Sequence, residues 1–182
     1  MSLTLFLFMG LVGVFFLTFL KAPLMNLLGE DNFLISKLNN AEWFQNYWLA
    51  GIFLFIANAI LFFSTALLLY VLSYFLIPYV HLLVMILAVI GSIFLWMTIN
   101  KTWHGTRKNR LKMAAVGSSF YLILSIILIY MFVTLEPSFP GDDPFMRAIG
   151  LLMGIVVTTV AFLSCFIFTG FSNRKEVNGA RF

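Results

Sequence analysis

Five apolar stretches without a charged side chain constrain this sequence more than any other feature. They cover residues 2–20, 48–76, 79–100, 113–135 and 148–171, and none contains Asp, Glu, Lys or Arg. At about 1.5 Å per residue, roughly 20 helical residues cross the hydrocarbon core of a bilayer. An α-helix satisfies its own backbone polar groups there. The sequence therefore predicts an all-α integral membrane protein, a single polytopic domain with a bundle of about five transmembrane helices.

Composition excludes a water-soluble domain. Only 10% of the 182 residues are charged and 62% are hydrophobic, whereas soluble domains carry about 25% charged residues. A soluble fold of this size could not bury so much apolar surface. The basic residues flank the apolar stretches and form no separate basic domain, so no nucleic-acid partner is expected. The single cysteine, Cys165, excludes an intramolecular disulfide.

Proline positions and stretch lengths indicate the helix boundaries. The five prolines all fall between the apolar stretches, as expected for helices. The last span is expected at about residues 146–171. The stretch 48–76 is long for one crossing, so it either tilts or breaks near Ser73. If residues 2–20 only lay in the membrane interface, a four-helix core would remain.

Residues 31–47 are too polar to span the membrane. Their pattern predicts an interfacial amphipathic helix on the inner leaflet; the alternative is a loop with interfacial aromatic side chains. The apolar face would consist of Leu34, Leu38, Ala41, Phe44 and Trp48.

Charge distribution predicts the orientation. With the N-terminus outside and the C-terminus cytoplasmic, every Lys and Arg except Arg147 lies inside. All four tryptophans then fall at the inner boundary, and several tyrosines fall near the outer one, where interfacial aromatics are common. The many codons for Phe, Ile and Leu favour a low-GC genome, and we therefore expect a bacterial cell membrane.

The absence of charge at membrane depth argues against a self-sufficient proton- or sodium-coupled transporter. His81 and His104 are expected on opposite faces of the membrane, so they cannot jointly ligate a haem or metal. The acidic residues Glu136, Asp142 and Asp143 are too few for a closed calcium loop. No cofactor or metal is therefore expected.

Small and polar residues on two spans predict helix packing. Gly150 and Gly154 form a G-x-x-x-G that continues through Thr158, and residues of this size let helix backbones approach closely. In the second span, Gly51, Asn58 and Thr65 repeat every seven residues. Asn58 is the strongest polar group at membrane depth, and it needs a partner in lipid.

The loop before the fourth span is strongly basic. Topology alone accounts for its charge, but such clusters also attract anionic lipid or an acidic cytosolic partner. Its basic residues are Lys101, Arg107, Lys108, Arg110 and Lys112.

Three functions remain open. The leading interpretation is a non-catalytic accessory or interaction subunit, with other membrane subunits or a second copy as its partners. The alternative is a small-solute transport or binding component without an ion-coupling site, whose pocket would be lined by Asn58, Thr65, Ser118, Tyr121 and Ser125. The third is an intramembrane enzyme with a nucleophilic Cys165 beside His104.

Overall fold

The computed structural model describes residues 12, 38, 41–75, 79–137 and 144–171, and within these ranges it contains helices and no strand. After a short 3-10 turn, η1 (Glu42–Gln45), come α3 (Tyr47–Phe75), α4 (Val80–Thr102), α5 (Arg107–Val133) and α6 (Phe145–Gly170). These four described helices are long and apolar enough to cross a membrane. The predicted all-helical class is confirmed. The predicted span at residues 2–20 lies outside the described residues, apart from Val12.

The structure settles one predicted helix break and explains one helix start. α3 runs unbroken through Ser73, whose hydroxyl donates to the Tyr70 carbonyl at 2.6 Å, so the break considered there is absent. α5 begins at Arg107, well before the apolar stretch, because Thr106 caps it: its hydroxyl accepts a hydrogen bond from the Asn109 amide at 3.4 Å. Four of the five basic residues predicted in this loop therefore belong to the first turns of α5, and Lys101 belongs to the end of α4.

The described part of the predicted interfacial helix is different from the prediction. It is the four-residue 3-10 turn η1, and Phe44 within it is fully buried against the hydrophobic core. Leu38 and Ala41 also pack against that core. These apolar side chains therefore face the protein, and residues 31–37 and 39–40 lie outside the described residues.

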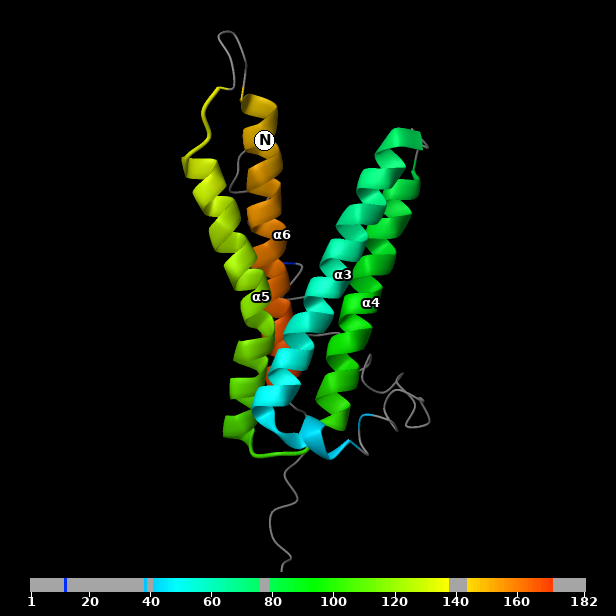
Figure 1. Cartoon of the computed structure of the whole chain (residues 1–182), viewed down its shortest axis with the longest axis vertical. Coiled ribbons are helices and arrows are strands. Elements are labelled where there is room, and N and C mark those ends of the chain that lie inside the picture. Colours follow the sequence, from blue (N-terminus) through cyan, green and yellow to red (C-terminus); the bar gives the residue numbers. More distant parts are fainter. Residues whose placement is uncertain (1–11, 13–37, 39–40, 76–78, 138–143, 172–182) are drawn as a thin grey trace, which may run out of the picture.

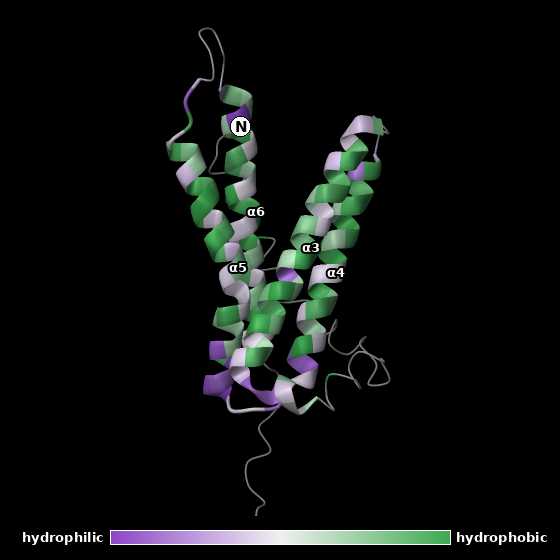
Figure 2. Cartoon of the chain, viewed as in Figure 1, coloured by the Kyte–Doolittle hydropathy of each residue, from purple (hydrophilic) through white to green (hydrophobic). Residues whose placement is uncertain are grey.

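The helices alternate in direction and form two antiparallel pairs, α3 with α4 and α5 with α6 (Figure 1). The start of α3, the end of α4, the start of α5 and the end of α6 lie together. We call this the basic end because it carries Lys101 and the basic residues of the first turns of α5 (Figure 2). The opposite end, called the far end, carries Tyr79 and Arg147.

Side-chain packing is concentrated in the half of the bundle nearest the basic end. The buried residues of α3 fall between Ala50 and Asn58, and those of α4 and α6 begin at Trp96 and Thr158. Toward the far end the two helix pairs separate (Figure 1), and Leu67 of α3 is 64% exposed. The two pairs are thus joined at one end and separate at the other.

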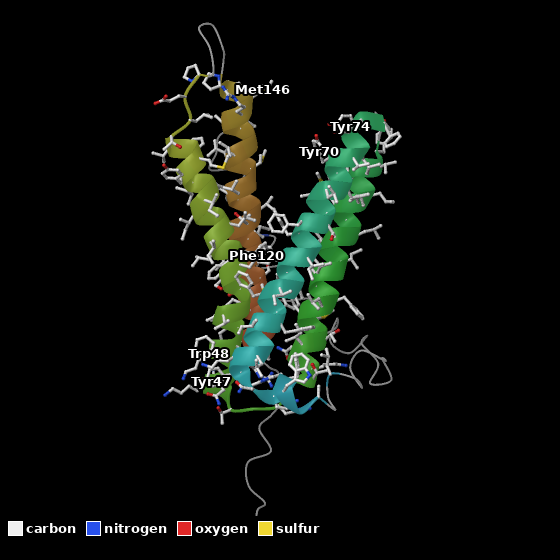
Figure 3. All side chains as sticks on the ribbon, in the orientation of Figure 1. Tyr47, Trp48, Tyr70, Tyr74, Phe120 and Met146 are labelled. Atoms are coloured by element: carbon white, nitrogen blue, oxygen red, sulfur yellow. The ribbon has the colours of Figure 1, made fainter. Side chains whose placement is uncertain are left out.

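Phe120 of α5 lies where the two pairs begin to separate (Figure 3). Its ring packs edge-on against Phe55, Phe62 and Phe63 of α3, with centroids 5.5, 5.9 and 6.1 Å away. Edge-to-face aromatic pairs contribute about 0.5–1.5 kcal/mol beyond their buried area. This aromatic cluster therefore closes the packed half of the bundle.

Closer to the basic end, α3 and α5 approach through glycines. A Cβ added at Gly117 would lie 2.2 Å from Cδ2 of Leu54, and one added at Gly51 would lie 2.9 Å from Cβ of Val116. Neither distance is compatible with a real side chain. Each glycine thus leaves the space that a side chain on the opposite helix fills.

We expect Gly117→Ala to destabilise the bundle by about 1–3 kcal/mol, because the added methyl overpacks against Leu54. Gly91→Ala is the matched control, since nothing lies within 4 Å of the Cβ position there. It should be neutral or slightly stabilising through the higher helix propensity of alanine. Denaturant unfolding of the full chain in detergent micelles measures both. Equal stability of the two variants would contradict the close approach of α3 and α5.

Candidate functional site

Among the described residues, no group of three or more His, Cys, Asp or Glu side chains is placed to hold a metal ion. His81 lies in the first turn of α4, and His104 follows its end, so the two sit at opposite ends of this helix. A 23-residue helix is roughly 34 Å long. The two histidines therefore cannot act on one ligand.

Among the described residues, Asn58 is the polar side chain that connects the most helices, and it is fully buried in α3. Its Nδ2 donates to the Gly117 carbonyl of α5 at 3.1 Å and to Sγ of Cys165 in α6 at 3.5 Å. Its Oδ1 accepts a hydrogen bond from Nε1 of Trp96 in α4 at 2.9 Å. One amide group thus contacts all four long helices, and its donors and acceptor are all used.

A second polar layer lies nearer the basic end and is centred on Asn100 of α4. Its Nδ2 donates to the backbone carbonyls of Phe168, Thr169 and Phe171, the last at 2.9 Å. The last carbonyls of a helix have no partner within the helix. Asn100 therefore caps the end of α6 with a side chain from a different helix.

Arg110 completes this second layer. Its guanidinium donates to the Trp103 carbonyl at 2.9 Å and to Oδ1 of Asn100 at 3.4 Å, and it lies over the Trp103 ring at 5.6 Å. Its side chain is only 8% exposed. The sequence predicts Arg110 on a lipid or partner surface, whereas in the structure it points inward and donates to backbone and amide oxygens of the core.

The turn η1 is fastened to the basic end by a glutamine. Nε2 of Gln45 donates to the Thr102 carbonyl at 3.2 Å, and its Oε1 accepts from the His104 backbone amide at 2.9 Å. These two bonds join the segment before α3 to the connection between α4 and α5. His104 itself is exposed, whereas Cys165 is fully buried in the Asn58 layer.

The residues predicted to pack against other helices differ in whether they do so. Gly51 and Asn58 face α5, whereas the Thr65 hydroxyl bonds only the Leu61 carbonyl of its own helix. In α6, Gly154 lies against Leu128 of α5, at 3.1 Å from the Cβ position to Cδ1.

The other two residues of the α6 motif also differ from each other. Thr158 is buried and donates to the Gly154 carbonyl at 2.8 Å. Gly150 is exposed, with nothing within 4 Å of its Cβ position. The G-x-x-x-G face is thus half used within the bundle.

The basic residues also separate into two groups. Lys101 is partly buried near the end of α4, while Arg107, Lys108 and Lys112 are exposed on the first turns of α5. The Lys112 ammonium lies 5.3 Å from the centre of the Tyr47 ring. An outward-facing basic surface therefore remains after Arg110 is removed from the predicted set.

Sequence reasoning missed the tryptophan partners. The sequence predicts all four tryptophans at the membrane interface; Trp43 and Trp48 are 48% and 55% exposed. Trp96 and Trp103 are 4% and 1% exposed and belong to the core. Nε1 of Trp96 donates to Asn58, whereas the buried Nε1 of Trp103 has no partner among the described residues. A buried indole N–H usually finds an acceptor, so the need of Asn58 for a partner was a signal for Trp96.

We expect Asn58→Ala and Trp96→Phe to destabilise the bundle non-additively, because each removes the same hydrogen bond. Coupling energies between residues that share a hydrogen bond in membrane proteins average about 0.6 kcal/mol and reach about 1.7 kcal/mol. Unfolding of the two single variants and the double variant measures the coupling. The matched control pairs Asn58→Ala with Ser73→Ala, whose hydroxyl donates to the Tyr70 carbonyl of its own helix. Additive effects in both pairs would contradict the Asn58–Trp96 bond.

Comparisons with known proteins assign no family to this chain. No family model matches it, no curated protein sequence matches it, and no solved structure matches its fold. The polar layers, the unequal use of the α6 glycines and the basic surface are therefore the observations from which a function is inferred.

Proposed function

We propose that this chain is a non-catalytic multi-pass membrane protein that acts as an interaction subunit of a larger membrane assembly. The observation that carries the proposal is the one-ended packing of the bundle. The basic half is densely packed and its Asn58 and Asn100 amides are hydrogen bonded to the other helices, while the far halves of the two helix pairs are separate (Figure 1). Such a molecule has a rigid base and extensive apolar side surfaces on which further helices can pack.

The exposed side of α6 supports this reading. Gly150 and Val157 are exposed, with Val157 at 61%, and an open glycine lets another helix backbone approach closely. Gly154, by contrast, is already in contact with Leu128. The same motif therefore offers one internal contact and one free contact, and the free one suits a helix of another subunit or of a second copy.

The alternative, a small-solute transport or binding component, has less support. Asn58 is enclosed and fully hydrogen bonded, and the Ser118 hydroxyl, also buried, donates to the Ala115 carbonyl of its own helix at 3.4 Å. Ser125 pairs with Thr159 at 3.3 Å. The polar groups that would recognise a solute are thus engaged with protein atoms.

A catalytic role has less support still. A Cys–His nucleophile requires the imidazole beside the thiol, but Cys165 is buried beside Asn58 while His104 is exposed beyond the end of α4. Burial makes a cysteine behave as a small hydrophobic side chain. We therefore assign Cys165 a role in helix packing and no role in catalysis.

We place the basic end on the cytoplasmic side of a cell membrane. The exposed basic residues of α5 gather there, and among the described residues only Arg147 is basic at the far end. A bias of this kind sets the orientation of multi-pass proteins. With α6 ending at the basic end, the C-terminus would be cytoplasmic.

We expect native mass spectrometry after gentle detergent extraction from the source membrane to show a mass well above 20.7 kDa. Gly150→Ile should reduce the bound fraction without changing the stability of the chain itself, because the side chain enters open space. Gly154→Ile is the matched comparison, since it meets Leu128 and should destabilise the bundle internally. A lone chain, or Gly150→Ile without effect on assembly, would refute the subunit proposal as built on α6.

A further inference from the structure

A basic and aromatic surface joins the starts of α3 and α5. Tyr47 and Trp48 open α3 and lie together at the basic end, beside α5 (Figure 3), with their ring centroids 5.9 Å apart. Lys112 of α5 places its ammonium over the Tyr47 ring at 5.3 Å. Lys108 lies one turn earlier on the same side of α5 and is exposed. We call these four residues the lysine–aromatic surface.

The electrostatics of this surface favour an anion. Lys108 and Lys112 are four residues apart on one helix, where like charges repel each other. Neither α3 nor α5 contains an acidic residue; Glu42 is the first residue of η1, and Glu136 lies beyond the opposite end of α5. The start of α3 adds the positive end of a 29-residue helix dipole. A negatively charged group placed there would relieve the repulsion between the two lysines.

The surroundings of the surface favour a lipid over a soluble anion. Trp48 is 55% exposed, and Ile52, one turn further along α3 toward the middle of the bundle, is 45% exposed. Leu49, which follows Trp48 in the sequence, is also 45% exposed. Cationic groups, then an exposed tryptophan, then exposed aliphatic side chains follow one another from the basic end toward the middle of the bundle. A phospholipid has the same order of anionic headgroup, ester region and acyl chains.

We propose that the lysine–aromatic surface binds an anionic phospholipid of the leaflet at the basic end. The phosphate lies at Lys108 and Lys112, and an acyl chain runs over Trp48 and Ile52. Arg110 is not part of this lipid site. Its guanidinium points inward and donates to Asn100 and to the Trp103 carbonyl, so the phosphate is bound by the two lysines. The inference is independent of the subunit proposal, since it needs no partner protein.

The test uses the full chain in nanodiscs of phosphatidylcholine with a minor fraction of phosphatidylglycerol. Native mass spectrometry of the protein released from them measures the retained phosphatidylglycerol relative to phosphatidylcholine. We expect Lys112→Gln to lower this preference about five-fold, the equivalent of the roughly 1 kcal/mol that one basic residue contributes near an anionic surface. Lys101→Gln removes the same charge from the same end but from α4, and it should have a much smaller effect.

Further variants distinguish a specific lipid-binding site from a general attraction of anionic lipids to the positive charge of the basic end. Lys112→Arg should retain the preference, and Trp48→Ala should lower the retention of both lipids without changing the charge. Lys108→Gln replaces Lys112→Gln if the latter unfolds. Equal losses for Lys101→Gln and Lys112→Gln would overturn the proposal. Displacement of phosphatidylglycerol by soluble glycerol 3-phosphate would also overturn it, because the surface would then recognise the phosphate group without its lipid.

Discussion

The buried amide of Asn58 is the interaction on which the packed half of the bundle depends. In hydrocarbon, an unpaired polar group costs several kcal/mol, so each of its hydrogen-bonding atoms requires a partner. The partners are Trp96, Gly117 and Cys165, one from each of the other long helices. In lipid, interhelical hydrogen bonds add to van der Waals packing between helices. The Asn58 amide forms such bonds from α3 to all three of the other long helices.

Gly117 of α5 allows the Asn58 amide to reach the backbone of that helix. Gly117 supplies the carbonyl that Asn58 bonds, and the missing side chain of the same residue leaves the space into which Leu54 fits. Leu54 is one turn before Asn58 on α3. One residue of α5 thus serves both the polar and the apolar contact. Nearer the basic end, Asn100 of α4 donates to backbone carbonyls at the end of α6. Arg110 of α5 donates to the carbonyl of Trp103, just beyond the end of α4.

The sequence allows the helices to be predicted but not their mutual contacts. Apolar stretches free of charge indicate spans because the energetic penalty for charge in lipid is large and local. The need of Asn58 for a partner followed from the same penalty. The identity of that partner did not, because an indole suits both the interface and a polar core, and only the packing of α4 against α3 places Trp96 inside. Arg110 was misplaced for a similar reason: a basic residue near a helix start reads as exposed unless its acceptors, Asn100 and the Trp103 carbonyl, are known.

The hydrogen bonds of Asn58 become available in a fixed order while the chain is being made. Its partner Trp96 is 38 residues away, the Gly117 carbonyl 59 and Cys165 107. Because synthesis proceeds from the N-terminus and earlier segments begin to assemble first, α3 and α4 can pair before α5 exists. The bond to Cys165 and the capping of α6 by Asn100 must wait for the last helix. Insertion of α6 is therefore the step that completes both polar layers, and a chain stopped before it would expose in lipid the amide donors of Asn58 and Asn100 that α6 accepts.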